Sequence, residues 1–213
     1  MAMTNVVSDG TPFGGVEGFL GTNPISFSVP TDLGFPITLD MATSVAAMGK
    51  IDHASNEQDR IPETWAFDAD GDPTTDPSAV AALRPVGGPK GYGLGIVVDI
   101  LCGLLTGAGT SPTVGPLYDD YDKPMQLGHV LAAIDPSVFR DIEAFKSDVG
   151  AYVEAIKEQP RREGTDEIRV PGELESLAKR ESKRDGIKLN DDARDGLHSL
   201  SERYEIPLPD GLS

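Results

Sequence analysis

Residues 92–105 form the most apolar helix candidate of the chain, and they limit the possible folds more than any other feature. Their leucines and valines fall on nearby turns of a helix, and Asp99 is the only charged residue among them. A helix that is apolar on most sides belongs in the interior of a domain. The segment therefore predicts a central, buried helix.

Short strands are predicted on both sides of this helix. Residues 25–29 alternate apolar and polar side chains between Pro24 and Pro30, which is typical of a half-buried strand. Residues 37–39 predict a second short strand, and residues 130–134 predict a buried one. Strands together with helices place the chain in the α/β class.

Start and stop signals predict two more helices in this part of the chain. The first covers residues 43–50, with Ser44 near its start. The second follows Asp135 and Pro136, which predict an N-cap and a first helical residue. Its apolar face is expected to hold Ile142, Phe145, Val149, Val153 and Ile156.

After Pro160 the sequence predicts helices with few apolar residues and many charged ones. A short amphipathic helix is predicted around Leu174, Leu177 and Ala178, and Asn190 predicts the cap of a last helix. That last helix carries Ala193, Leu197, Leu200 and Tyr204 along one stripe. Two helices with such thin apolar faces cannot form a core alone. We therefore predict a domain at 1–160 and a helical segment at 161–213 that needs a partner surface.

The charge is strongly acidic and uneven. Acidic residues outnumber basic ones by 35 to 18, a net of −17, which argues against nucleic acid or membrane as a partner. Residues 1–160 hold 22 acidic and 8 basic residues, whereas residues 161–205 hold 12 and 10, and Asp210 follows. Such acidity fits a surface solvated at high salt, so we expect a halophilic source.

Nothing in the sequence predicts export or membrane insertion. The N-terminus lacks the basic and apolar regions of a signal peptide, and the longest uncharged stretch, residues 100–118, is interrupted by glycine and proline. We expect a soluble, cytoplasmic protein. Cys102 is the only cysteine and lies in an apolar run, so a buried, inert thiol is predicted.

Three segments suggest a ligand site rather than packing alone. Residues 39–44 predict a strand end that leads into a helix start, where free N–H groups attract anions. Residues 87–93 surround Lys90 with four glycines, which allow close backbone approach. Residues 170–173 predict a tight turn into a helix. Each segment also has a plain structural interpretation as a cap, a solvated turn or a simple turn.

Several common sites are excluded by spacing. No Gly-x-Gly-x-x-Gly fingerprint, Walker A loop or HExxH motif is present, and no metal site is predicted. The acidic run at 68–72 lacks the glycine and glutamate of an EF-hand and predicts a surface turn. His53 is expected in a polar loop, His129 in a structural role and His198 on an exposed helix face.

The motifs taken together resemble the type 2 malate/L-lactate dehydrogenase family. They comprise PFGG at 12–15, LGTNPI at 20–25, IPE at 61–63, WAFDADG at 65–71 and PTTDP at 73–77, besides the three segments above. The resemblance runs over residues 2–204. It implies a non-Rossmann fold, with a mixed, largely antiparallel sheet flanked by helices, plus C-terminal helices. It also implies an NAD- or NADP-dependent oxidoreductase.

The resemblance also implies roles for particular residues. The cofactor site would hold Met41, Ala42, Thr43, Ser44, Pro89, Lys90, Pro171, Gly172 and Glu173. Thr4 and Asn5 would border the pocket of a small 2-keto or 2-hydroxy acid, and Asp52 would lie near a position that orients the catalytic histidine. The cofactor domain would be residues 1–160.

Two functional hypotheses follow from the resemblance. In the family, a histidine of a Ser-His-Gly motif donates the proton and an arginine binds the substrate carboxylate, and this sequence contains neither motif. The chain could be an oxidoreductase, working as a homodimer or with a separately encoded N-terminal half against which the 161–213 segment packs. Alternatively, it could be an inactive remnant that at most binds nucleotide. The isolated chain is expected to be inactive.

Overall fold

The computed structural model describes residues 1–116, 121–209 and 211–212, so Tyr118 and Asp210 lie outside the described residues. The chain divides into two compact units, Met1–Gly172 and Glu173–Ser213. This boundary lies after the predicted one at residue 160, because residues 161–172 are tied to the first unit. Lys157 and Glu167 form an ion pair at 2.9 Å, and the Thr38 N–H donates to the Pro171 carbonyl.

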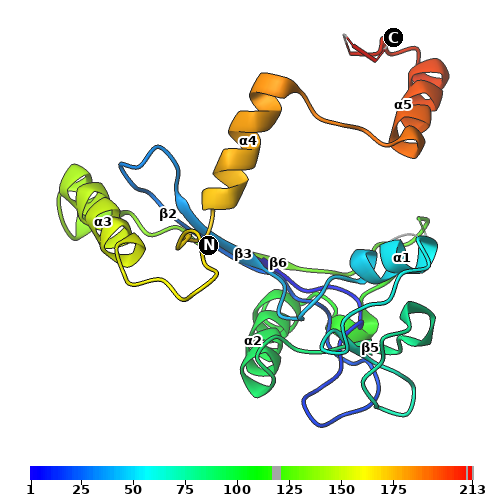
Figure 1. The fold of residues 1–213 in the computed structure, drawn as a ribbon. Helices are drawn as coiled ribbons and strands as arrows, with labels where there is room; N and C mark the ends of the chain where they lie inside the picture. The colour runs from blue at the N-terminus through cyan, green and yellow to red at the C-terminus, as the bar shows by residue number, and fades with distance from the viewer. Residues whose placement is uncertain (117–120, 210, 213) are drawn as a thin grey trace. The chain divides into compact units, whose positions relative to one another are not determined.

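A four-stranded antiparallel sheet organises the first unit (Figure 1). Its order is β3 (Ile37–Met41), β2 (Ile25–Val29), β1 (Ala2–Thr4) and β6 (His129–Leu131). A second sheet pairs β4 (Ala66–Phe67) with β5 (Ala82–Leu83). The alternation at 25–29 therefore predicted β2 correctly, and the strand predicted at 37–39 extends to Met41.

The two faces of the four-stranded sheet differ in their cover. On one face, Met3, Ile25, Met41 and Val130 pack with Val98 and Cys102 into a core. These last two residues belong to α2 (Pro89–Asp99) and to the π-helix η2 (Ile100–Leu104) that continues it. The residues that alternate with the core positions lie on the opposite face. We call this the open face and define it by Ala2, Thr4, Ser26, Asp40, His129 and Leu131.

The prediction of a helix buried on most sides is wrong for one side of α2 and η2. Gly95, Val98 and Cys102 are buried, but Val97 is 50% exposed and Leu104 is 63% exposed. The small residues let the helix approach its neighbours closely: a Cβ on Gly95 would lie 3.2 Å from the Thr43 hydroxyl. Uniform apolarity could not indicate which side faces the sheet.

Two further sequence predictions are corrected by the structure. The helix predicted at 43–50 is α1 (Met48–Asn56), so Ser44 precedes it and His53 lies on it rather than in a loop. The buried strand predicted at 130–134 is the short β6, and Leu131 and Ile134 are about four-fifths exposed, at 80% and 79%. Leu131 lies on an outer strand of the sheet, and Ile134 lies in the loop between β6 and η4.

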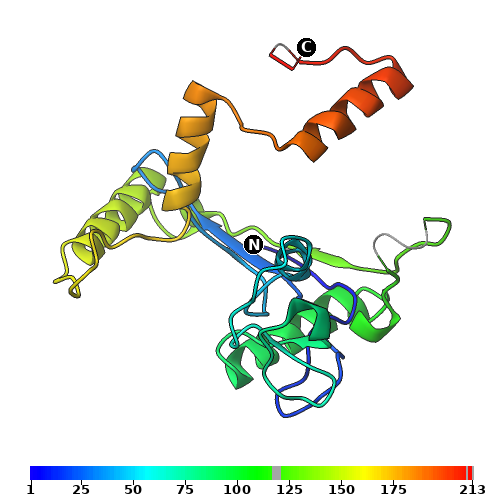
Figure 2. The same ribbon diagram turned by 45° about the vertical axis from the view of Figure 1, so that its right-hand side comes forward.

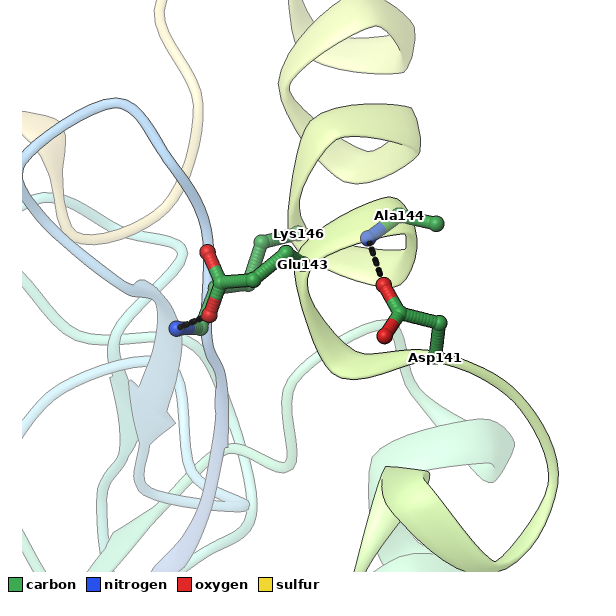
Figure 3. A network of polar contacts seen from close by, with 4 residues as sticks. All are labelled: Asp141, Glu143, Ala144 and Lys146. Atoms are coloured by element: carbon green, nitrogen blue, oxygen red, sulfur yellow. Dashed lines mark hydrogen bonds and ion pairs between the residues drawn. The ribbon is translucent and has the colours of Figure 1, made fainter.

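Helix α3 (Ile142–Lys157) carries the predicted face, but its N-cap is Asp141 rather than Asp135. The Asp141 carboxylate accepts the Ala144 N–H at 2.9 Å, and Lys146 pairs with Glu143 at 2.7 Å (Figure 3). Asp135 instead caps the 3₁₀ turn η4 (Pro136–Val138). Gly150 lets α3 pack on the turn between β2 and β3, because a Cβ there would collide with the Asp32 carboxylate.

The remaining short elements are the 3₁₀ turns η1 (Pro77–Ala79) and η3 (Ser111–Thr113). In the second unit, α4 (Glu173–Asp185) and α5 (Asp191–Tyr204) confirm the two predicted C-terminal helices (Figure 2). The Asn190 side chain caps α5 by accepting the Ala193 N–H at 2.9 Å. None of the helices among the described residues has the length and apolar character needed to cross a bilayer.

Candidate functional site

Strand β3 brings two of the predicted cofactor segments together. At its start, the Thr38 N–H donates to the Pro171 carbonyl at 3.0 Å. Gly172 follows with φ +88°, and a Cβ there would lie 2.9 Å from both the Pro36 oxygen and the Thr38 nitrogen. Glycine is therefore the residue that this close approach requires. Glu173 begins α4 in the second unit.

At the other end of β3, the chain leaves the sheet after Met41 and does not enter a helix at residues 42–44. The Thr43 N–H and hydroxyl both donate to the Thr22 carbonyl, at 2.8 and 3.1 Å, and the Ser44 hydroxyl donates to the Ala46 carbonyl at 2.6 Å. Met41 packs into the core. The helix start predicted at residues 43 and 44 is therefore wrong, because α1 begins only at Met48.

The turn before α2 lies directly beside this segment. The Val86 N–H donates to the Thr43 carbonyl at 2.9 Å, and the Val45 N–H donates to the Arg84 carbonyl at 2.8 Å. Two left-handed glycines follow, Gly87 at φ +60° and Gly88 at φ +62°. The structure thus links residues 41–44 through this turn to Pro89 and Lys90.

Lys90 occupies the first turn of α2 and is exposed. Its amine forms no hydrogen bond or ion pair within the part of the chain that the structure describes. The N-terminus of α2 carries a partial positive charge, and no side chain caps it. The amine and the helix end together offer a positive group to an anion next to a glycine turn.

Thr4 and Asn5 end strand β1 and have different surroundings. The half-buried Thr4 hydroxyl donates to the Gly128 carbonyl at 2.9 Å. Asn5 is fully buried, and its Nδ2 donates to Asp99 Oδ1 at 3.0 Å and to the Gly109 carbonyl at 2.7 Å. Its Oδ1 accepts the Gly128 N–H at 2.9 Å. In this structure the Asn5 side chain is therefore an anchor between segments far apart in the sequence.

A buried polar network extends from Asn5 and was not found by sequence reasoning. Asp99 accepts the Ser111 N–H at 2.9 Å and the Ser111 hydroxyl at 3.0 Å, and it is 7% exposed. Asn23, in the LGTNPI motif, donates to the Gly95 carbonyl at 3.0 Å and accepts the Val6 N–H at 3.1 Å. The available signal was Asp99 itself, since a lone carboxylate in an apolar helix needs buried donors.

Asp52 lies on α1, where it is exposed, and its charge acts on Asp9. Burial raises the pKa of the Asp9 carboxyl, and the neighbouring charge of Asp52 raises that pKa further. Asp9 belongs to the loop after β1. The backbone carbonyl of Asp9 accepts the Leu83 N–H at 2.7 Å. Sequence reasoning did not single out Asp9, because no local pattern indicates the approach of α1.

Two cavities lie near these residues. One of about 300 Å³ lies on the open face and is lined by Thr4, Asp40 and His129, among others. The other, of about 500 Å³, lies between the 11–16 loop and the turn before α2, with the Arg84 guanidinium stacked 4.7 Å from the Phe67 ring. Within residues 1–116, 121–209 and 211–212, no three His, Cys, Asp or Glu side chains are grouped to hold a metal ion.

One family model and several known proteins are similar to this chain. The model of the malate/L-lactate dehydrogenase family matches residues 1–198. Ureidoglycolate dehydrogenase (NAD(+)) from Escherichia coli K12 is 38% identical over 203 residues, which are 93% of this chain and 58% of that protein. Malate/(S)-sulfolactate dehydrogenase from Methanothermus fervidus is 35% identical over 213 residues, which are 98% of this chain and 60% of that protein.

Solved structures agree with these sequence matches. Malate dehydrogenase from Entamoeba histolytica superposes with a TM-score of 0.90 at 28% identity, over 98% of this chain and 62% of that one. Sulfolactate dehydrogenase from Methanocaldococcus jannaschii superposes with a TM-score of 0.84 at 35% identity, over 96% and 58%. The chain spans 58% and 60% of the length of the two relatives compared by sequence. With its family model matched over residues 1–198, the chain belongs to the malate/L-lactate dehydrogenase family.

Proposed function

We propose that this chain is an NAD(P)-dependent oxidoreductase unit that transfers a hydride between nicotinamide and a 2-hydroxy or 2-keto acid. The observation that carries the proposal is the continuity of the site along β3. The Pro171–Gly172 turn packs at the start of the strand, residues 41–44 follow its end, and the turn before Lys90 is hydrogen bonded to them. These are the segments that family resemblance assigns to the cofactor.

The residues of the site suit a dinucleotide in charge and shape. Lys90 and the N-terminus of α2 would bind its phosphates, and the backbone at Gly87, Gly88 and Gly172 is open to close approach. Met41, Ala42, Thr43 and Ser44 would form the wall of the site through their backbone. Pro171, Gly172 and Glu173 would border the nucleotide. The nicotinamide, when bound, supplies the hydride, and the protein supplies orientation and charge.

Thr4 is the proposed substrate-side residue, because it lines the cavity on the open face. Asn5 would act by holding the end of β1 through its buried hydrogen bonds rather than by touching substrate. Asp52 would influence the site electrostatically through Asp9. The preferred cofactor is open between NAD and NADP, since names of relatives include both forms.

A second candidate is a chain that binds nucleotide but turns over substrate only as a homodimer or with a separate N-terminal half. The exposed apolar side chains favour it: Leu104 is 63% exposed on η2, and Leu200 is 51% exposed on α5. In either case the second unit, residues 173–213, would pack against a partner surface.

The deciding experiment is a fluorescence titration of the full chain with NADH and NADPH, followed by NAD(P)H oxidation with 2-keto acids. We expect binding of at least one cofactor. Lys90→Ala should weaken it by about 1–3 kcal/mol, the size of a charge-assisted hydrogen bond. Lys188→Ala, an exposed lysine between α4 and α5, is the matched control and should change nothing. Absence of nucleotide binding would contradict the proposed function; binding without oxidation would favour the second candidate.

A further inference from the structure

His129 lies on the open face of the sheet, on the opposite side from the hydrophobic core. It pairs directly with Thr4 across β1 and β6, so the two side chains are neighbours on one face. Both line the cavity of about 300 Å³, together with Ala2, Ser26, Asp40 and Leu131. The imidazole is exposed and forms no hydrogen bond with any described residue. The sequence predicted a structural role for His129 just before a buried strand, and the exposed imidazole does not show such a role.

The cavity has the His129 imidazole at one end and the Asp40 carboxylate at the other. Asp40 is the only carboxylate among its lining residues, and it lies on β3, whereas His129 lies on β6. Two strands separate these outer strands, so the two groups are roughly 14 Å apart by the spacing of strands in a sheet. An anion on this face would therefore lie near the imidazole and away from the carboxylate.

The other two histidines do not share this setting. His53 is exposed on α1, and His198 lies on α5 in the second unit. Neither is among the residues that line the two cavities described above. His129 is thus the one histidine that the described structure places next to a proposed substrate-side residue.

We propose that His129 binds the carboxylate of the 2-keto or 2-hydroxy acid on the open face, with the Thr4 hydroxyl oxygen beside it. The inference rests on the proposed function and names a substrate residue within it. An imidazole gains a full positive charge near neutral pH, so it suits an anionic acid whose binding strengthens as pH falls. Asp40 keeps the acid at the His129 end by repulsion.

The first test uses the imidazole signals of the unmodified full chain. With only three histidines in the chain, nitrogen-15 spectra give three imidazoles, assigned by single His→Gln variants. The chain is saturated with the cofactor that binds, and oxalate or pyruvate is then added. We expect the His129 signal alone to shift. A shift confined to His53 or His198, or no shift, would overturn the inference while leaving cofactor binding intact.

The second test measures affinity for the same anions at pH 6 and pH 8. His129→Ala should weaken oxalate binding about tenfold at pH 6 and leave cofactor affinity unchanged, and wild-type binding should weaken by roughly tenfold from pH 6 to pH 8. His53→Ala is the matched control and should behave as wild type. Equal oxalate affinity in both variants overturns the assignment of His129. Failure of the cofactor itself to bind overturns the proposed function and this inference together.

Discussion

The helix α2 with its extension η2 and the helix α5 both expose leucines, yet they are held in different ways. Beneath α2, Val98 and Cys102 pack on the sheet, and Asp99 is bonded to Asn5 and Ser111. No residue of α5 is buried, and its defined anchor is the Asn190 cap. An exposed apolar stripe can therefore arise in two structural situations. On α2 it is the outer side of a fixed core helix, whereas on α5 it is the only apolar surface the helix has.

The strongest way to break this contrast is to remove the carboxylate under α2. Asp99→Ala leaves the Asn5 amide and both Ser111 donors without their acceptor in a buried site. We expect the free energy of unfolding to fall by about 3 kcal/mol, measured by urea denaturation. The matched control is Asp195→Ala on the exposed surface of α5, which should change it little. Equal effects of the two variants would contradict the distinction.

A substitution at Gly95, one of the two buried glycines of α2, tests how closely this helix packs against its neighbours. Gly95→Val should destabilise by about 2 kcal/mol, because a Cβ already lies 3.2 Å from the Thr43 hydroxyl and the branch would overpack the site. Gly93→Ala, where the space around the Cβ is open, should instead stabilise by about 0.5–1 kcal/mol. Thermal unfolding of both variants measures the two stability changes. If both variants change stability in the same direction, close packing of α2 at Gly95 is contradicted.

The cap of α5 should have a smaller and local effect. Asn190→Ala removes the acceptor of the Ala193 N–H, which costs about 1 kcal/mol of helix stability. Hydrogen exchange should become faster in residues 191–204 and stay unchanged in α2. Asn190→Asp is the control, since aspartate caps equally well. Faster unfolding of the first unit or faster exchange in α2 would show that the helices are coupled.

The smallest expected effect concerns pH. Because the folded-state pKa of Asp9 is raised, its ionisation opposes folding, and the stability present in acid is lost as pH rises through that pKa. Asp9→Asn should therefore melt at a higher temperature than wild type at pH 7, with the difference vanishing below about pH 4. Asp52→Asn should reproduce part of the gain.

Asp135→Asn is the control of opposite sign. Hydrogen bonds from Ser137 lower the pKa of the Asp135 carboxyl, so its ionised form supports folding above the ordinary aspartate pKa. The variant should be less stable at pH 7, and this loss should disappear in acid. Melting curves for the three variants between pH 3 and pH 7 give the comparison, and a stabilising Asp135→Asn would refute the sign argument.

Local patterns predicted the elements that local chemistry determines. The alternation at 25–29 gave β2, Asn190 marked the start of α5, and the apolar spacing gave the face of α3. The same local chemistry misplaced helix starts where two signals compete: Asp135 caps a 3₁₀ turn, and Asp141 caps the helix.

Predictions that depended on distant contacts were less successful. Nothing around residue 44 indicates that Ser44 lies against Pro85, which removes it from a helix start. The partners of Asp99 lie 94 residues before it and 12 after it, so no window of sequence contains the buried network. The cofactor segments were grouped by family resemblance, and the open face became visible only from strand register.

The single thiol of Cys102 makes it possible to measure how often η2 separates from the sheet. It is completely buried, and burial raises the pKa of the thiol, so it is unreactive while the helix is seated. A disulfide reagent can then modify it only during moments when this layer separates. The limiting rate of labelling therefore reports how often the layer opens, with no introduced probe, and added cofactor that tightens the site at β3 should slow it.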